Sequence, residues 1–457
     1  MADVVRAGAE VARPGRALVV GLGLAGEAAA RRLAERGWSV TVAEDRPSTA
    51  TRARSSALAA RGVAVIESPV PAAMASLVDN ADMVVPSPGV PAAHPAIARA
   101  LAMETDVCSE LELAARWSSL PMVAVTGTNG KTTVTTLVEG MLKASGLRTV
   151  AASNNDLPLV DALAREPELD LIVVEASSFR LQFSRCFRPR VAVWLNQAED
   201  HLDWHGSQEV YAWAKSRVWA AQEGDDVAVA NAEDPVVMGW AAKVRSRLVT
   251  FGLDRGDWRA GDHTLLQPDG QVLVGVDELW RALPHDRANA LAASATAVAA
   301  GASLEGVRST LRSFRGLAHR LCLVGTDDGV AFYDDSKATD PHATAAALDG
   351  FPSVVLIAGG RNKGLDLSVL VAHADRLRAV VAIGEAGDEV VRTFAGVVPV
   401  ARAGSMDEAV AAARTAARPG DAVLLSPACA SYDWYSSYRE RGDDFARAVA
   451  DSMGAHP

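Results

Sequence analysis

Short apolar runs alternate with longer, Ala-rich amphipathic stretches along the chain. Strands that are buried on both faces read as continuous apolar runs, and in parallel sheets they alternate with helices. Turn-forming or polar residues follow the runs, which places loops at the carboxyl ends of the strands, where α/β proteins bind ligands. The pattern therefore predicts an α/β protein with strands at Ala17–Val20, Met83–Val85, Val123–Val125, Leu171–Val174, Val191–Leu195, Val354–Ile357, Val380–Ile383 and Ala422–Leu425.

The length of the chain indicates more than one domain, because 457 residues exceed what one hydrophobic core usually organises. Residues 1–110 contain one glycine-rich turn, and residues 111–316 contain a second one that includes a lysine. Residues 317–457 have a strand–helix alternation of their own. We therefore expect three α/β domains with these boundaries.

The composition narrows the class of partner. The net charge of −11 argues against nucleic acid or an anionic membrane as a partner. No apolar segment approaches the ~18 residues that a membrane span needs. The run Arg16–Ala30 resembles a signal peptide, but glycines and Glu27 interrupt it. The four cysteines lie far apart, so we expect no disulfide and no metal cluster, and a reducing, cytoplasmic location.

The first glycine-rich turn has the spacing of a dinucleotide-binding motif. Gly21, Gly23 and Gly26 follow the first predicted strand, and an acidic pair, Glu44 and Asp45, comes where a ribose-binding acid is expected. Glycines let the backbone approach a pyrophosphate, and the N-terminus of the following helix stabilises its charge. NAD and UDP both offer these groups. An NAD-dependent oxidoreductase, a UDP-binding domain and a turn without a ligand therefore all remain open.

The second glycine-rich turn predicts a nucleoside triphosphate site. It reads TGTNGKT at residues 126–132, and it departs from the common GxxxxGK[ST] loop because Val125 stands where that pattern has its first glycine. The loop amides can point at phosphate oxygens, Lys131 can neutralise the β- and γ-phosphates, and Thr132 can ligate Mg²⁺. The residues expected to bind ATP here are Gly127, Thr128, Asn129, Gly130, Lys131, Thr132 and Thr133.

Polar residues after the next predicted strands extend this site. Glu175 follows one strand directly and is a natural second protein ligand for Mg²⁺. The next strand leads into EDHLDWH at residues 199–205, where His201 could ligate a metal, orient the substrate or act as a base. Lys215 lies on the predicted helix that follows, where an isolated lysine is usually solvated.

The order of eight motifs resembles a known family. The motifs are GTNGKT, EASSF, EDHLDWH, NA at 289–290, AHR at 318–320, DDSKAT at 334–339, AGGRNKG at 358–364 and SPACAS at 426–431. This set covers essentially the whole chain and resembles the Mur ligase family, most closely its glutamate-adding branch. The resemblance implies an N-terminal Rossmann-like domain for UDP, a central P-loop ATPase-like domain and a C-terminal Rossmann-like domain that brings the amino acid.

The resemblance also implies a reaction. Members of this branch join D-glutamate to UDP-N-acetylmuramoyl-L-alanine in peptidoglycan precursor synthesis, through an acyl phosphate made with ATP and two Mg²⁺ ions. L-glutamate addition and folate polyglutamylation are alternatives within the ligase class, and a nucleotide-binding regulator without activity is another. We expect the protein to be a monomer.

Residue roles follow from the resemblance by position. Lys215 matches a lysine that is carbamylated in the family, which reverses its interpretation as a solvated side chain. The metal ligands are then Thr132, Glu175, His201 and carbamylated Lys215, and the catalytic residues are Lys131, His201, Lys215 and Arg320. The ATP site gains Asn289, Arg320 and Asp335, the UDP-precursor site has Leu24, Glu44, Asp45, Ser87, Gly89 and Asn154, and the glutamate site has Thr339, Lys363, Ser431 and Tyr438.

Several positions depart from the family pattern. The family's GNIG loop reads SNND at residues 153–156, Arg180 stands in place of Gln, and Asp340 stands in place of Asn. Tyr438 replaces the usual Phe. These positions belong to the expected substrate cleft, so they bear on the substrate more than on the reaction class. Near the expected ATP contacts, Asp286 stands where Asn is usual.

Overall fold

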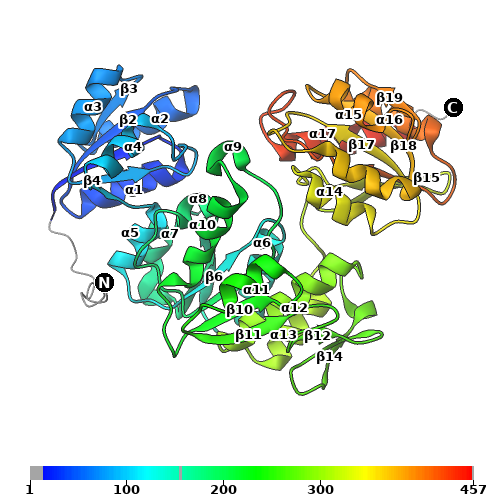
Figure 1. The fold of residues 1–457 in the computed structure, drawn as a ribbon, viewed down its shortest axis with the longest axis horizontal. Coiled ribbons are helices and arrows are strands. Elements are labelled where there is room, and N and C mark those ends of the chain that lie inside the picture. The colour runs from blue at the N-terminus through cyan, green and yellow to red at the C-terminus, as the bar shows by residue number, and fades with distance from the viewer. Residues whose placement is uncertain (1–13, 154–156, 455–457) are drawn as a thin grey trace. The chain divides into compact units, whose positions relative to one another are not determined.

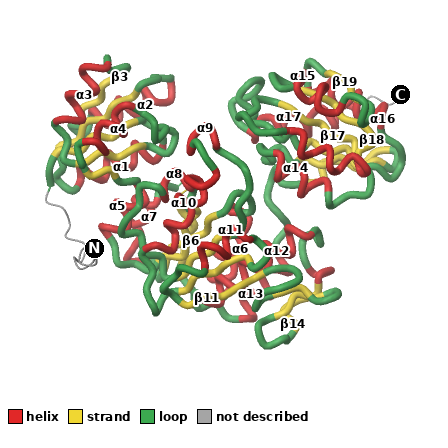
Figure 2. The backbone as a smooth tube through the Cα atoms, viewed as in Figure 1, coloured by secondary structure: helices red, strands yellow, loops and turns green. Residues whose placement is uncertain are grey.

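The predicted apolar runs all lie in parallel strands of the computed structural model, which describes residues 14–153 and 157–454. The runs form three separate sheets, and helices surround each sheet (Figures 1 and 2). The strand interiors are buried, and the most protected side chains of each sheet are Val, Leu, Ile and Ala. The structure therefore confirms three α/β domains.

The N-terminal domain has a five-stranded parallel sheet in the order β3-β2-β1-β4-β5. Its strands and helices are β1 Arg16–Val20, α1 Leu24–Glu35, β2 Ser39–Glu44, α2 Thr49–Ala59, β3 Ala64–Glu67, α3 Pro71–Asp79, β4 Met83–Pro86, α4 Pro95–Ala102, β5 Asp106–Val107 and α5 Glu110–Trp117.

The central domain has a six-stranded parallel sheet in the order β11-β10-β9-β6-β8-β7, and a small antiparallel sheet β12-β13-β14 that the apolar runs did not predict. Its elements are β6 Met122–Thr126, α6 Lys131–Ala144, β7 Thr149–Ser153, α7 Leu159–Ala162, η1 Leu163–Glu168, β8 Leu171–Glu175, α8 Ser178–Leu181, β9 Val191–Trp194, α9 Leu202–His205, α10 Gln208–Ala220, β10 Val227–Asn231, α11 Pro235–Ala241, β11 Arg247–Phe251, β12 Arg259–Ala260, β13 Thr264–Leu266, β14 Val272–Gly275, η2 Val276–Glu278, α12 Pro284–Ala299 and α13 Leu304–Ser313.

The C-terminal domain has a six-stranded sheet in the order β15-β16-β20-β17-β18-β19, in which only β15 runs antiparallel to its neighbour. Its elements are β15 Cys322–Asp327, β16 Val330–Asp334, α14 Pro341–Leu348, β17 Val354–Gly359, η3 Leu367–Arg376, β18 Leu377–Ile383, α15 Gly387–Phe394, β19 Val400–Arg402, α16 Met406–Ala416, β20 Ala422–Leu425 and α17 Tyr438–Gly454.

The chain divides into two compact units. The first comprises residues up to Gln197, Trp204–Leu279 and Arg287–Ser313. The second comprises Ala198–Asp203, Trp280–Asp286 and the chain from Phe314 onward. Two short central segments thus belong to the unit that contains the C-terminal sheet. The predicted domain boundaries at residues 110 and 316 stay a prediction.

Candidate functional site

The loop between β6 and α6 has a backbone that requires glycine. Gly127 has φ of 155° and Gly130 has φ of 85°, which side chains with a Cβ atom rarely adopt. A Cβ atom on Gly130 would lie 2.5 Å from Asn289 Oδ1. The structure therefore brings Asn289, an expected ATP contact far away in the sequence, directly against the loop.

Lys131 holds a positive charge on this loop. Its Nζ atom donates hydrogen bonds to the carbonyl oxygens of Gly127 at 2.8 Å and Thr128 at 2.7 Å. The side chain therefore folds back over the residues whose amides are expected to bind phosphate. Phosphate oxygens are stronger acceptors for an ammonium group than neutral carbonyls are, so a bound triphosphate can take over these contacts.

Asn196 fixes the loop from the neighbouring strand. Its Oδ1 accepts hydrogen bonds from the amides of Thr128 at 3.0 Å and Asn129 at 2.9 Å, and its Nδ2 donates to the Asn129 carbonyl at 3.2 Å. Asn196 was not among the predicted site residues. The available signal was topological, because β9 pairs with β6 and the loops after both strands meet at one sheet edge.

Thr132 and Glu175 form a pair that fits a magnesium site. Thr132 Oγ1 lies 3.3 Å from Glu175 Oε1, and Glu175 is 1% exposed. Two adjacent oxygen ligands of one octahedral Mg²⁺ lie about 2.9 Å apart, given metal–oxygen distances of about 2.1 Å. The hydroxyl of Ser177, in the loop after β8, is buried without a hydrogen bond. The donor chemistry and the spacing therefore suit a hard divalent cation.

Lys215 is not the solvated side chain that an isolated helical lysine suggests. It is 1% exposed on α10. Its Nζ atom lies 3.0 Å from Thr128 Oγ1, 2.9 Å from Gln197 Oε1 and 3.2 Å from the centre of the Tyr211 ring. These three groups are neutral, and one of them belongs to the phosphate loop. The lysine predicted to be carbamylated is therefore buried beside the predicted ATP site.

His201 belongs to the second compact unit, together with Asp200 and Lys363. Lys363 Nζ donates to Asp200 Oδ1 at 2.6 Å, and His201 Nε2 lies 3.1 Å from Asp200 Oδ2. Burial raises the pKa of Asp200, but the positive charges of Lys363 and His201 outweigh it and hold the pKa below its usual value. The structure thus groups His201 with Lys363, which was predicted to bind the glutamate substrate.

The four predicted metal ligands are divided between the two compact units. Thr132, Glu175 and Lys215 belong to the first unit and His201 to the second. Across the described ranges, no three His, Cys, Asp or Glu side chains gather as a metal site. The predicted set contains only two residues of those types, and its membership stays a prediction.

Asp335 is a buried acid in the loop after β16. Its carboxylate accepts hydrogen bonds from Leu321 N at 3.2 Å and Ser426 Oγ at 2.8 Å. Burial raises the pKa of Asp335 to about 7, although the Ser426 hydroxyl and the charges of Arg320 and Arg281 act against this shift. Asp286, which replaces the usual Asn, forms a two-point ion pair with Arg281.

The four residues predicted to bind glutamate are distributed over three loops and one helix. Three lie in loops that follow adjacent strands, and the fourth starts α17. The strands β16, β20 and β17 are neighbours, so their carboxyl ends share one edge. Ser431 is 2% exposed, and the Tyr438 hydroxyl accepts a hydrogen bond from Lys337 Nζ at 3.1 Å. Lys337 was not predicted, although its position inside DDSKAT was a signal.

Two residues that depart from the family pattern form hydrogen bonds or ion pairs within the protein. Arg180 pairs with the buried Glu110 at 3.1 Å and also donates to the hydroxyl of Ser153. Asp340 caps α14 by accepting from Ala343 N at 2.9 Å. Asn154, predicted for the UDP-precursor site, lies outside the described residues.

The first glycine turn is held by an acid. Glu44 Oε2 accepts from Leu22 N at 2.6 Å and Glu44 Oε1 accepts from Arg46 N at 2.8 Å. A Cβ atom on Gly23 would lie 3.0 Å from Ser87 Oγ, so Ser87 covers the turn. The remaining predicted residues, Leu24 and Gly89, lie at the start of α1 and in the loop after β4, and Leu24 is 49% exposed.

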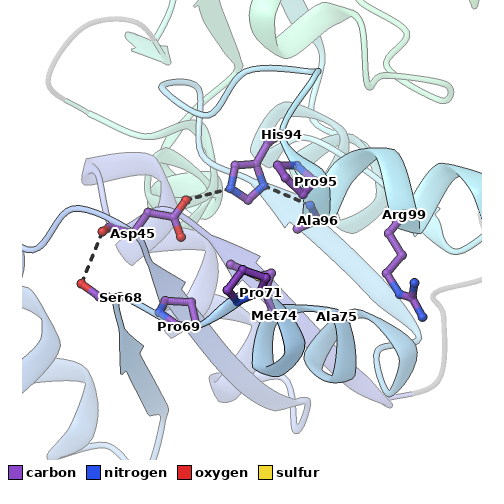
Figure 3. A pocket seen from close by; sticks show the side chains of 10 residues that line it. All are labelled: Asp45, Ser68, Pro69, Pro71, Met74, Ala75, His94, Pro95, Ala96 and Arg99. Carbon is purple, nitrogen blue, oxygen red and sulfur yellow. Dashed lines mark hydrogen bonds and ion pairs between the residues drawn. The ribbon is translucent and has the colours of Figure 1, made fainter.

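A cavity of about 630 Å³ opens at Asp45 (Figure 3). Ala96 N donates to His94 Nδ1 at 3.2 Å, so the proton on Nε2 points to Asp45 Oδ2, 2.7 Å away. The sequence did not single out His94. The cavity is lined by Asp45, Ser68, Pro69, Pro71, Met74, Ala75, His94, Pro95, Ala96 and Arg99.

In the part of the chain that the structure describes, none of the helices has the length and apolar character needed to cross a membrane.

Three family models match the chain in sequence order. The Mur ligase MurD-like N-terminal domain matches residues 15–109, the Mur ligase middle domain matches residues 125–297, and the Mur ligase glutamate ligase domain matches residues 319–429. Together they cover the regions of all three sheets.

Solved ligases share the fold. MurF from Acinetobacter baumannii has a TM-score of 0.59 at 18% identity, covering 98% of this chain and 92% of that one. The UDP-N-acetylmuramate-alanine ligase from Thermotoga maritima has a TM-score of 0.57 at 20% identity, covering 96% and 99%. At these identities the likeness shows the fold alone.

Two relatives are similar over nearly their full length. The UDP-N-acetylmuramoylalanine–D-glutamate ligase of Frankia casuarinae is 44% identical over 444 residues, which cover 94% of this chain and 93% of that protein. The ligase of the same name from Thermobifida fusca is 41% identical over 463 residues, which cover 95% and 98%. The sequence, the fold and the order of the matched domains agree, and the chain belongs to the Mur ligase family.

Proposed function

We propose that this chain uses ATP to join D-glutamate to the alanyl carboxylate of UDP-N-acetylmuramoyl-L-alanine. The observation that carries the proposal is the central loop, where Lys131 supplies a cation and Thr132 and Glu175 offer paired oxygens. The relatives from Frankia casuarinae and Thermobifida fusca have names that state this substrate pair. Because UDP-linked precursors and ATP are cytoplasmic compounds, we expect the reaction in the cytoplasm, carried out by a monomer.

The chemical difficulty is that a carboxylate is anionic and has no leaving group. Its oxygen attacks the γ-phosphorus of ATP, ADP departs, and the acid becomes an acyl phosphate. The glutamate amine then attacks the acyl carbon, loses a proton, and inorganic phosphate leaves with the bond electrons. The enzyme's task is therefore mainly to stabilise negative charge and to align the reactants.

The residues of the central loop fit the first step. Lys131 would neutralise the phosphates, and Asn289, which packs against Gly130, would contact the nucleotide. Thr132 and Glu175 would hold Mg²⁺, which when bound withdraws charge from the phosphate oxygens. Arg320 and Asp335 would contribute from the C-terminal domain.

Lys215 fits the chemistry of a carbamate. Lys215 is buried beside the predicted ATP site, and the neutral amine is the form that adds carbon dioxide. The product would replace a cation by an anionic oxygen ligand for a metal. Incubation with ¹³C-bicarbonate should give a carbamate NMR signal that Lys215→Ala lacks, and short carboxylates should partly restore turnover of that variant. A folded variant with an unchanged signal argues against the carbamate.

Lys363 fits the second step, because a substrate with two carboxylates needs a cationic partner. In the structure this ammonium is paired with Asp200 at 2.6 Å. A glutamate carboxylate would replace Asp200 as its partner. Ser431, Thr339 and Tyr438 lie on the same sheet edge and would complete the site.

The cavity at Asp45 supports a nucleoside-linked substrate, because its largely apolar wall also carries an acid, Asp45, and the basic side chains His94 and Arg99. Its volume exceeds the lower limit of about 300 Å³ for ligand pockets.

The test is phosphate release from ATP with UDP-N-acetylmuramoyl-L-alanine, supplied with D-glutamate, L-glutamate or neither. We expect release that requires both the precursor and D-glutamate. Release with L-glutamate instead would make the chain an L-glutamate-adding variant. No release with either amino acid would overturn the ligase assignment.

A further inference from the structure

A fully buried arginine lies where three loops of the C-terminal domain meet. Arg441, in the first turn of α17, is 1% exposed. Its Nε donates to Ser336 Oγ at 2.9 Å, its Nη2 donates to the Ser336 carbonyl at 2.8 Å, and its Nη1 donates to the Cys429 carbonyl at 3.1 Å. A Cβ atom on Gly360 would lie 3.0 Å from Nη1. One guanidinium therefore touches the loops 334–339, 358–364 and 426–431.

Each of these three loops carries one residue of the proposed glutamate site. Thr339 belongs to the first loop, Lys363 to the second and Ser431 to the third. The fourth residue of that site, Tyr438, starts the helix that carries Arg441, and its carbonyl accepts a hydrogen bond from Ser336 Oγ at 2.8 Å. The arginine thus connects all four chain segments that the proposed function assigns to the amino acid.

The position of this cation is costly for folding. Its three hydrogen bonds go to a hydroxyl and two carbonyls, and no carboxylate of the described residues forms an ion pair with it. It also lies at a helix N-terminus, where the backbone dipole disfavours positive charge. Burial lowers the pKa of Arg441 to about 10, which still leaves it charged at neutral pH. Asp433 and Asp334 offset part of the cost of this charge without forming an ion pair with it. Proteins seldom keep a buried charge that lacks a direct ion pair without a functional reason.

A second buried arginine, unlike Arg441, forms an ion pair with a carboxylate. Arg180 in the first unit is 6% exposed, and the carboxylate of Glu110 lies 3.1 Å from its Nη1. A carboxylate is thus paired directly with the guanidinium of Arg180, whereas Arg441 has no such ion pair and only the more distant charges of Asp433 and Asp334. Low-polarity surroundings make the potential of a buried charge reach further than it would in water.

We propose that Arg441 is a positioning residue for the incoming glutamate. It fixes the three loops in one arrangement, and its positive charge, which no direct ion pair neutralises, raises the affinity of their shared edge for a dicarboxylate. This inference rests on the proposed ligase function, because it names the residue that organises the glutamate site of that reaction.

The test compares Arg441→Met, Arg441→Lys and the matched control Arg447→Met. Arg447 lies on the same helix, is about half exposed and pairs with Asp407, Asp444 and Asp451 at the surface. The measurements are the KM values for D-glutamate, ATP and the UDP-linked precursor. A further measurement is precursor-dependent exchange of labelled ADP into ATP without glutamate, which reports acyl-phosphate formation alone.

For Arg441→Met we expect the KM for D-glutamate to rise at least tenfold, while the KM values for ATP and precursor and the exchange rate stay within about twofold of wild type. Arg441→Lys keeps the charge but loses the planar fork, so its KM for D-glutamate should rise less. Arg447→Met should match wild type in every measurement.

An unchanged KM for D-glutamate in Arg441→Met would overturn the inference. So would an equal rise of all three KM values with slower exchange, because that pattern indicates a merely structural residue. If Arg441→Met does not fold, Arg441→Lys decides in the same way. A wild-type enzyme without exchange and without glutamate-dependent turnover would overturn the proposed function itself, whereas an active wild type with an unaffected variant would overturn only the role of Arg441.

Discussion

Two strand–turn–helix units of this protein place glycines after a buried strand, yet they present different charges to a ligand. After β1, the amide of Leu22 is already bound by the carboxylate of Glu44 at 2.6 Å. After β6, the corresponding amides of Thr128 and Asn129 are bound by the neutral side chain of Asn196, and the Lys131 ammonium lies on the loop.

This difference separates the two turns chemically. A phosphate on the Leu22 amide would meet an anion, so a diphosphate at the first turn must use amides further along, at the start of α1. A phosphate on the second loop would meet a cation. Glycine spacing predicts the path of the backbone, whereas the side chain that packs against the amides determines which ligand the turn can take.

The largest expected effect comes from Lys131, the cation whose ammonium group lies on the second turn. Lys131→Ala should lower kcat by about 10²–10³, the scale of losing one preorganised group that stabilises developing charge. Phosphate release in the complete reaction measures it, with Lys143→Ala on the exposed face of the same helix as the control. Equal turnover in both variants would remove the distinction between the turns.

The next effect tests the backbone of each turn. Gly130→Ala introduces a side chain at φ of 85° and 2.5 Å from Asn289 Oδ1, and we expect it to raise the KM for ATP and to destabilise the protein by about 2–3 kcal/mol. Gly23→Ala has φ of −72° and meets only Ser87 Oγ at 3.0 Å. We expect it to cost less than about 1 kcal/mol. Urea denaturation compares the two, and similar losses would contradict the geometry.

A smaller effect tests the side chains that bind the amides. Asn196→Ala leaves two loop amides without their acceptor, which should cost about 1–3 kcal/mol and raise the KM for ATP. Glu44→Gln keeps one acceptor oxygen but places an NH₂ group against the second amide, so it should cost about 1–3 kcal/mol. Its kinetic effect should fall on the KM for the UDP-linked precursor. A changed KM for ATP in Glu44→Gln would show that the two turns are not separate sites.

The last prediction concerns the pH dependence of the free energy of unfolding. It rests on Asp335, which the family resemblance assigns to the same ATP as the second turn. Burial raises its pKa to about 7. Between about pH 4 and pH 7 the unfolded chain has released this proton and the folded protein has not, so the unfolded state binds fewer protons. The free energy of unfolding therefore falls with rising pH in this window, by at most about 1.4 kcal/mol per pH unit, and is constant above it.

Asp335→Asn removes this titration, and its one amide oxygen can accept from Leu321 N while its NH₂ group can donate to Ser426 Oγ, which can reorient its hydroxyl. The stability of the variant relative to wild type should rise from about pH 4 to about pH 7 and then level off. Urea titrations across the range measure the difference. A difference that does not change with pH would contradict the raised pKa.

The fold could be predicted where burial makes strands uniformly apolar. All eight predicted runs lie in parallel strands. The antiparallel sheet β12–β14 and the hairpin β15–β16 were missed. β12 and β13 have only two and three residues, and β15 is partly exposed and interrupted by Gly325.

The candidate site could be predicted where chemistry is local. The loop with Lys131 is contiguous in sequence, and Glu175 follows a strand that pairs with β6. Asn196, the burial of Lys215 and the loops around Arg441 depend on side chains that meet only after folding. Arg441 lies 105 residues from Ser336, its hydrogen-bond partner, and nothing in its local sequence marks it as buried.

The most direct test of the account follows an oxygen atom. If the central loop lets ATP phosphorylate the alanyl carboxylate, precursor labelled with ¹⁸O in that carboxylate must pass one labelled oxygen to inorganic phosphate in each turnover. Mass spectrometry of the phosphate formed with ATP and D-glutamate measures this transfer. The account predicts singly labelled phosphate in proportion to the amide formed. Unlabelled phosphate released alongside labelled amide product would contradict it.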